Sequence, residues 1–199
     1  MVDCLLTILV NQICRLFSTH QTPDSIITQE EEEETDTTTE LEGTWKTACY
    51  TNSDNTSNID TLTFAGNALT VKEEEHSDTS CATDYSLEEF PLTFSIGDAV
   101  TFANGKTGHK MTVTLGSTYK ITPQSASAVS AFISSSKCSA SNWELNTEKE
   151  CSTGDDAGDT KLCLYQLDGN NFYPDCNDSS YPSTSDIDTS DASSTFVKQ

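Results

Sequence analysis

The sequence predicts a mainly β protein: an antiparallel barrel of about eight short strands, stapled by disulfides, with one short helix packed on or in it. Three observations indicate this fold. Apolar and polar residues alternate in short segments, glycine or asparagine turns separate these segments, and six cysteines are spread through the same region. Alternation with a period of two places apolar side chains on one face of a strand. Short strands at regular spacing are typical of barrels and sandwiches.

The clearest hairpin surrounds Gly66-Asn67, a two-residue turn suited to type II′. This turn sets Phe64 opposite Leu69 across the hairpin. The next pair on the same face is Leu62 and Val71, with threonine or alanine at the positions between. One face of the hairpin is therefore apolar and the other polar, as a half-buried antiparallel sheet requires.

The alternation continues in residues 90–96, where Pro91 places the strand at an edge or at a bulge. Gly97-Asp98-Ala99 has the composition of a three-residue hairpin loop. Such a loop would set Phe102 opposite Phe94, with both side chains on the inner face.

Two more strands are expected between residues 111 and 121, and the pattern then breaks at Thr122-Pro123. Threonine is a helix-capping residue and proline favours the first helical turn, so we expect a helix to begin here and to end near Cys138. Serines make this helix weak on its own, so it needs a surface to pack on. Trp143 and Leu145 are expected to lie against it.

A last hairpin is expected around Gly169-Asn170. This turn sets Leu167 opposite Phe172, and it sets Cys163 opposite Cys176. The cysteine pair falls at a position where cross-strand side chains approach closely, so a disulfide between them is plausible.

Eight cysteines beside only two methionines indicate an oxidising compartment, outside the cytoplasm or on the cell surface. Cys138 and Cys151 bracket a 12-residue loop and form a candidate second pair. Cys49 and Cys81 would then pair by exclusion, although these four cysteines alone allow three connectivities. The cysteines expected to form disulfides are Cys49, Cys81, Cys138, Cys151, Cys163 and Cys176. There is no cysteine–histidine pair at zinc-ligand spacing, so we expect no metal site.

The net charge of −22 is spread along the chain. Up to residue 40 there are nine acidic residues and Arg15, giving −8; after it there are 23 acidic residues and nine lysines, giving −14. A surface of this sign repels nucleic-acid phosphates and anionic lipid, so we expect neither as a partner.

The chain divides into three segments. Residues 1–20 form a degenerate export or anchor-like segment, too short and polar to span a membrane but able to act as a peripheral tether. Residues 21–40 form an acidic, disordered linker, because a row of like charges cannot bury anything. The barrel domain covers 41–199, with a Ser/Asp-rich segment near 177–193 and a final edge strand at 194–197.

Four short stretches carry a resemblance to known families: Leu41–Trp45 with Cys49, Leu62–Asn67, Ser77–Cys81 and Thr122–Ala128. Together they are similar to a group of uncharacterised bacterial secreted lipoproteins. More distantly, Gly43-Thr-Trp45 and the Ser77–Cys81 stretch resemble the "adenomatosis polyposis coli down-regulated 1" domain of an animal Wnt-antagonist glycoprotein. That domain is a lipocalin-like barrel that binds lipid, so the resemblance implies a lipid-binding barrel here.

Gly43-x-Trp45 also resembles the first-strand motif of lipocalins, where the tryptophan closes the floor of the barrel. Lipocalins stack an arginine from a late strand on this tryptophan. The present chain has no arginine after Arg15. A lysine such as Lys198 substitutes for it only in part, since it lacks the planar guanidinium group.

These observations favour a secreted or surface-tethered, non-catalytic, monomeric module for a small apolar, lipid-like ligand. The candidate ligand-binding residues are Trp45, Phe64, Leu69, Leu92, Phe94, Phe102, Met111 and Tyr119. The alternative is that these residues fill the core, and that the domain is an acidic cell-surface structural, adhesion or protein-interaction module. The sequence contains no G-x-S-x-G, no H-E-x-x-H and no phosphate-binding loop, so we expect no enzyme and no cofactor. His76 follows three glutamates, but no metal-ligand spacing accompanies it, and an exposed strand end is the favoured interpretation.

Overall fold

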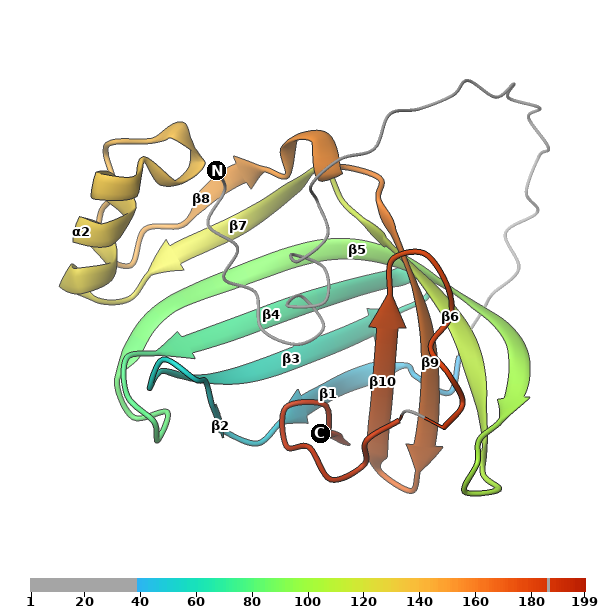
Figure 1. Ribbon diagram of the computed structural model, residues 1–199. Coiled ribbons are helices and arrows are strands. Elements are labelled where there is room, and N and C mark those ends of the chain that lie inside the picture. The colour runs from blue at the N-terminus through green and yellow to red at the C-terminus, as the bar shows by residue number, and fades with distance from the viewer. Residues whose placement is uncertain (1–38, 186) are drawn as a thin grey trace, which may run out of the picture.

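Eight strands pair into a closed antiparallel barrel in the computed structural model, which describes residues 39–185 and 187–199 (Figure 1). Their order around the barrel is their order along the chain: β1 (Gly43–Thr47), β3 (Ser57–Ala65), β4 (Ala68–His76), β5 (Asp84–Thr101), β6 (Thr107–Leu115), β9 (Thr160–Asp168), β10 (Asn171–Asn177) and β11 (Phe196–Lys198). β11 pairs with both β10 and β1 and so closes the ring. The predicted mainly β, antiparallel barrel of about eight strands is confirmed.

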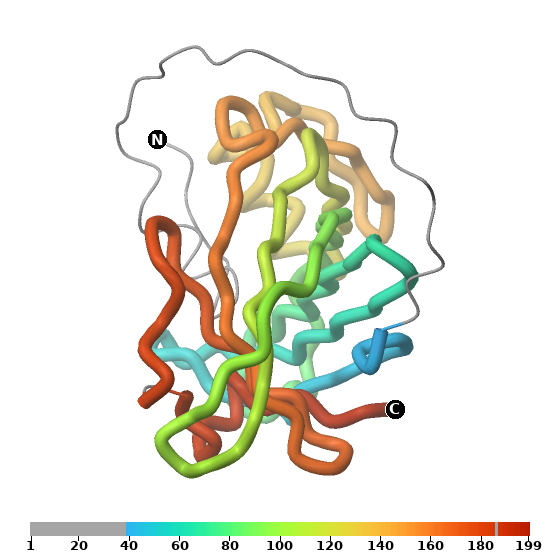
Figure 2. The backbone as a smooth tube through the Cα atoms, turned by 90° about the vertical axis from the view of Figure 1, so that its right-hand side faces the viewer, coloured from blue at the N-terminus to red at the C-terminus, as the bar shows by residue number. Residues whose placement is uncertain are grey.

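The remaining elements lie outside this ring. β2 (Tyr50–Thr51) adds to β3, and β7 (Thr118–Pro123) adds to β5. β8 (Lys149–Ser152) pairs with β7. The connection between β7 and β8 contains α2 (Ala126–Ser135) and the short 3-10 helix η1 (Lys137–Ser139), and η2 (Gly154–Asp156) follows β8. We call β7, α2, η1 and β8 the wing; Figures 1 and 2 show it to one side of the hairpin of β9 and β10.

β5 joins the wing to the barrel. One of its edges pairs with β4. The other edge pairs first with β7, over Ser86–Glu89, and then with β6, from Leu92 onward. Pro91 lies between these two partners. Gly116, at the turn from β6 to β7, packs so closely that a Cβ atom there would lie 2.4 Å from the carbonyl oxygen of Pro91. Only glycine fits at this fork.

The first predicted hairpin is confirmed in its register: Phe64 lies opposite Leu69, and Leu62 lies opposite Val71. Gly66 has φ +60°, which the first central position of a type II′ turn requires. The barrel wall therefore begins with the strand pair that the alternation predicted.

The hairpin predicted at residues 97–99 is wrong. β5 continues through this stretch, with a register shift against β6 between Ile96 and Ala99, and the chain turns only after Phe102, whose amide donates to the Lys106 carbonyl. An extra residue in one strand reverses which face the following side chains occupy. Phe102 is therefore buried outside the main core, against Gly108, where a Cβ atom would lie 2.5 Å from its ring.

The helix begins later than predicted. Thr122-Pro123 still belongs to β7 and pairs with β5. Ser125 is the N-cap, and its Oγ accepts a hydrogen bond from the Ala128 amide at 3.1 Å. Trp143 packs on Phe132 with ring centroids 5.1 Å apart, as expected. The same expectation for Leu145 is wrong, because this side chain is exposed.

Three disulfides link the predicted pairs: Cys49–Cys81, Cys138–Cys151 and Cys163–Cys176. The last lies across β9 and β10 at directly opposite positions, as the hairpin register indicated. The final strand is not an edge, since its residues pair on both sides within the ring. The export-like segment and nearly all of the linker lie outside the described residues. Within residues 39–185 and 187–199, no helix has the length and apolarity needed to cross a membrane.

Candidate functional site

The predicted ligand-binding residues lie mostly in the main barrel core. Trp45, Phe64, Leu69, Leu92, Phe94 and Met111 are buried there, Tyr119 is half-buried against them, and Phe102 is buried elsewhere. Aromatic rings of this core contact one another: Phe64 lies 5.0 Å from Phe94 and 5.7 Å from Phe172, between ring centroids. The apolar half of the barrel is thus occupied by the protein's own side chains.

Trp45 is buried in this apolar half and has partners on three sides. Its Nε1 donates to the Leu41 carbonyl at 2.7 Å, and its ring lies 5.6 Å from that of Phe172. The Nζ of Lys198, on the closing strand, lies 5.0 Å from the centroid of the Trp45 ring. Lys198, the lysine expected to contact this tryptophan, therefore makes a cation–π contact with it.

The inner face of β3, β4 and β5 changes character along the strands. Side chains that are directly opposite in the register form rows across this face, because residues two apart on a strand point the same way. The first rows are apolar: Phe64–Leu69–Leu92 and then Leu62–Val71–Phe90. The next row consists of Asp60–Glu73–Glu88, and the one after it of Asn58–Glu75–Ser86. We call Asp60, Glu73, Glu75 and Glu88 the acid cluster.

Each carboxylate of the acid cluster has its own partner. The Tyr50 hydroxyl donates to Asp60 Oδ2 at 2.8 Å, and the Asn58 amide donates to Glu73 Oε1. The Ser86 hydroxyl donates to Glu75 Oε2 at 2.8 Å. Glu88 Oε1 lies 3.2 Å from the Nζ of Lys137, in η1. The wing therefore reaches the cluster through one lysine.

Burial and mutual repulsion act on these groups together. Asp60, Glu73 and Glu88 are only 4%, 5% and 8% exposed. Burial, which disfavours the charged form, and repulsion from neighbouring carboxylates raise the pKa of all four acids, that of Asp60 to about 7. Burial also raises the pKa of the Tyr50 hydroxyl, reinforced by Asp60 and Glu73.

Two features leave the acid cluster incompletely compensated. Asp60 Oδ1 is buried and accepts no hydrogen bond. Within the described part of the chain, Lys137 is the one cation that forms an ion pair with the cluster. Buried carboxylates normally have hydrogen-bonding or charged partners, since an unpaired acceptor is costly. The arrangement can accept a donor or a positive charge.

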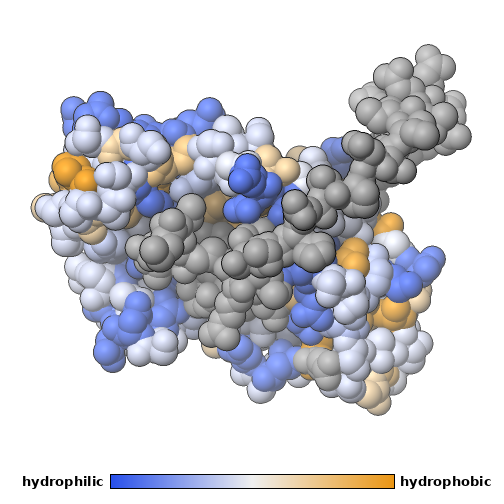
Figure 3. Space-filling model, turned by 45° about the horizontal axis from the view of Figure 1, so that its top comes forward, coloured by the Kyte–Doolittle hydropathy of each residue, from blue (hydrophilic) through white to orange (hydrophobic). Residues whose placement is uncertain are grey.

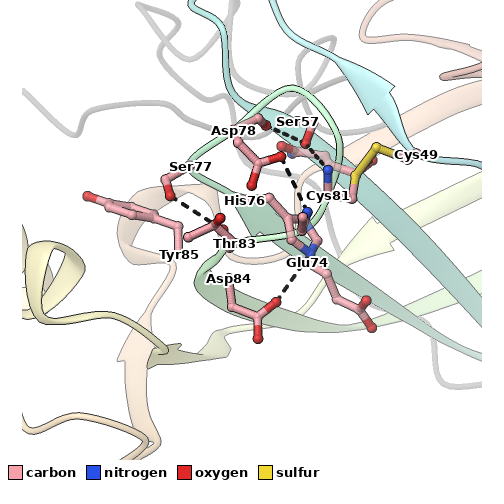
Figure 4. Close-up of polar contacts among 12 residues, drawn as sticks. Cys49, Ser57, Glu74, His76, Ser77, Asp78, Cys81, Thr83, Asp84 and Tyr85 are labelled. Atoms are coloured by element: carbon pink, nitrogen blue, oxygen red, sulfur yellow. Dashed lines mark hydrogen bonds and ion pairs between the residues drawn. A yellow bond between two sulfur atoms is a disulfide. The ribbon is translucent and has the colours of Figure 1, made fainter.

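A polar corner lies at the end of β4, next to the acid cluster (Figure 4). His76 is buried, not exposed as the sequence suggested, and its Nε2 lies 3.3 Å from Asp84 Oδ1. The Ser57 hydroxyl donates to the Asp78 carbonyl at 2.6 Å and accepts from the Cys81 amide at 3.0 Å, beside the disulfide to Cys49. Among residues 39–185 and 187–199, no group of three or more potential metal-ligating side chains is arranged to hold an ion.

The acid cluster was not predicted from the sequence, although the strand register contains a signal for it. The register that pairs Leu62 with Val71 also pairs Asp60 with Glu73, one step further from the turn. Alternation therefore places these acids on the core-facing side. Charged residues in a strand usually face solvent, so these acids were not expected on the inner face.

The fold and its inner surface define a closed eight-stranded antiparallel barrel with an aromatic region and, next to it, a row of buried acids. Comparison with known proteins finds no matching family model and no matching curated protein. The acid cluster and the apolar rows beside it are therefore the features that bear on function.

Proposed function

We propose that this protein is a non-catalytic binding protein that acts outside the cytoplasm and holds one small amphipathic molecule inside the barrel. The ligand lies over the inner faces of β3, β4 and β5. Its apolar part contacts the row Leu62–Val71–Phe90, and its polar part contacts the acid cluster. The observation that carries this proposal is the buried, unpartnered Asp60 Oδ1 on the inner face of β3, a strand of the closed barrel. Eight-stranded barrels have room for one small ligand.

The apolar part of the ligand is supported by the row beside the acid cluster. Phe90 stacks on Tyr119 at 5.0 Å between ring centroids and 7° between ring planes, so two parallel rings lie on the row beside the acid cluster. The resemblance to secreted lipoproteins and to a lipid-binding lipocalin-like domain supports the same interpretation. The three disulfides support a location outside the cytoplasm.

A second function, as an acidic surface or adhesion module, is favoured by the aromatic half of the barrel, which its own rings fill. Figure 3 shows a largely hydrophilic surface on which hydrophobic residues are scattered in small groups. The large hydrophobic side chains exposed in the described residues belong to Ile133, Leu145 and Val197. They lie on α2, on the loop after it and on β11.

Native mass spectrometry of the full oxidised chain, before and after extraction with organic solvent, tests the binding function. The extracted protein is then titrated with the apolar fluorescent probe N-phenyl-1-naphthylamine. We expect one bound molecule per chain and a blue-shifted probe. Val71→Thr, on the apolar row, should weaken probe binding, and Thr70→Val, on the opposite face of the same strand, should not. If the protein carries no bound molecule and takes up no probe, the binding function fails and the surface-module function is favoured.

A further inference from the structure

We infer that the ligand is an organic cation: an amphipathic amine whose ammonium group binds at Asp60 and Glu73 while its apolar body lies on the row Leu62–Val71–Phe90. This inference rests on the proposed function that the barrel binds a small molecule, and it adds the chemical class of that molecule. It is carried by the sign of the charge at the site, by the unpartnered oxygen and by the neighbouring apolar row.

The sign of the charge is set by the register. Asp60, Glu73 and Glu88 are consecutive partners across three strands, so their side chains are direct neighbours on one face. Like charges directly opposite one another destabilise a sheet. Lys137 compensates Glu88 from one side. An additional positive charge near Asp60 and Glu73 would relieve the remaining repulsion, whereas a carboxylate ligand such as a fatty acid would increase it.

The unpartnered oxygen defines where that charge binds. Tyr50 holds Asp60 Oδ2 and the Thr47 hydroxyl accepts from the Asp60 amide at 2.9 Å, so the carboxylate is fixed in place. Its other oxygen is buried without a donor. An ammonium group offers three donors and no acceptor, which matches this oxygen and the adjacent Glu73 carboxylate. Charge-assisted hydrogen bonds of this kind are the strong ones.

The neighbouring row explains why the cation is organic. One step along the strands from Asp60 and Glu73, the inner face becomes apolar at Leu62, Val71 and Phe90. Phe90 and the ring of Tyr119 stack there, and the Nζ of Lys137 already lies 6.0 Å from the Tyr119 ring centroid. An inorganic ion would use none of this surface. An aromatic amine would cover the row and bring its charge to the acids, with a cation–π contribution.

The test is calorimetric titration of the full oxidised chain with tryptamine at pH 8. Two ligands of the same shape serve as comparisons: indole-3-ethanol, which is neutral, and indole-3-propionate, which is anionic. We expect tryptamine to bind with one site per chain, indole-3-ethanol to bind about 10- to 100-fold more weakly, and the anion not to bind. Asp60→Asn and Glu73→Gln should each lower the affinity for tryptamine by about 10- to 100-fold. Glu89→Gln, which removes the same charge from the opposite face of β5, should lose none.

The pH dependence gives a second readout. The acids of the cluster must be ionised to bind a cation, and their pKa values are raised, so tryptamine affinity should increase from pH 5 to pH 8 and binding should release protons. Tyr50, Tyr85 and Tyr119 have raised pKa values and keep their protons in this range, and Lys137 keeps its charge. Asp54 and His76 also act on Glu75.

The outcomes separate the inference from the proposed function. If N-phenyl-1-naphthylamine binds and indole-3-propionate or laurate displaces it while tryptamine does not, the barrel is a carrier and the inference is overturned. If Ca²⁺ alone binds, and Asp60→Asn abolishes that binding while amines do not compete, the inference is also overturned. If no probe binds at all, the proposed function fails. Circular dichroism confirms that each variant is folded.

Discussion

Replacing Asp60 by asparagine is expected to stabilise the folded protein at neutral and alkaline pH. Asp60 is 4% exposed, it lies next to Glu73 in the register, and one of its oxygens has no donor. Asparagine has the same side-chain shape as aspartate, and its amide oxygen still accepts the hydrogen bond from the Tyr50 hydroxyl. Its amide group offers the donor that the cluster lacks, and the negative charge disappears.

The size of the effect follows from the pKa of Asp60, which burial and nearby carboxylates raise from 3.8 to about 7. The folded state therefore binds this proton more tightly than the unfolded chain. The stability that protonated Asp60 contributes to the folded state is complete below about pH 4 and is lost as the pH rises to about 7. A difference of about three pKa units corresponds to about 4 kcal/mol, and the weaker hydrogen bond from Tyr50 to a neutral group removes about 1 kcal/mol. Asp60→Asn should thus gain on the order of 2 to 4 kcal/mol at pH 8.

Urea unfolding at pH 4, 6 and 8, with the disulfides intact, measures this difference. The stability of Asp60→Asn relative to the natural chain should be near zero at pH 4 and should increase through pH 6. Glu89→Gln removes a charge on the outer face and should change stability little at any pH. A difference that is flat with pH, or a variant less stable than the natural chain at pH 8, would show that the buried charge of Asp60 does not destabilise the folded protein.

Three further predictions concern the barrel and the wing. Lys198→Ala should lower the free energy of unfolding by about 0.5 to 1 kcal/mol by removing the cation–π contact at the barrel floor, and Lys198→Arg should restore it; chemical unfolding followed by tryptophan fluorescence measures both. Gly116→Ala should cost about 1 to 3 kcal/mol, because its methyl group would meet the Pro91 carbonyl, and an unchanged melting temperature would contradict the fork geometry. The double variant Cys138→Ser/Cys151→Ser should speed hydrogen exchange in α2 and β8 while β3 and β4 stay protected, since this disulfide lies wholly within the wing.

The parts of the fold that the sequence predicted are those set by short-range geometry. Gly66-Asn67 leaves one register for the first hairpin, and the alternation then selects its inner face. The same logic at Gly169-Asn170 brings Cys163 and Cys176 together. One correct register was therefore sufficient to identify that disulfide.

The failures have the opposite character, because long-range pairing overrode a local signal. Gly97-Asp98 is a good turn sequence, yet the neighbouring strand β6 keeps β5 extended through it with a bulge. Thr122-Pro123 is a good helix start, yet it pairs with β5. The closing role of β11 depends on β1, about 150 residues earlier in the chain, and no local pattern reports it. The acid cluster was missed for a different reason: its charges were assigned to the solvent face against the alternation.

The chain leaves the barrel after β6, forms the wing, and rejoins the barrel at β9. β6 and β9 are neighbours in the barrel, and Leu115 still exchanges hydrogen bonds with the chain returning at Gly158 and Asp159, each 2.9 Å long. Residues 116–157 are therefore an excursion from a single hairpin, carrying their own disulfide and Lys137. A short turn in their place would leave an uninterrupted eight-stranded meander. The wing is an exchangeable module, and replacing it would alter the charge facing the acid cluster without disturbing the closure of the barrel.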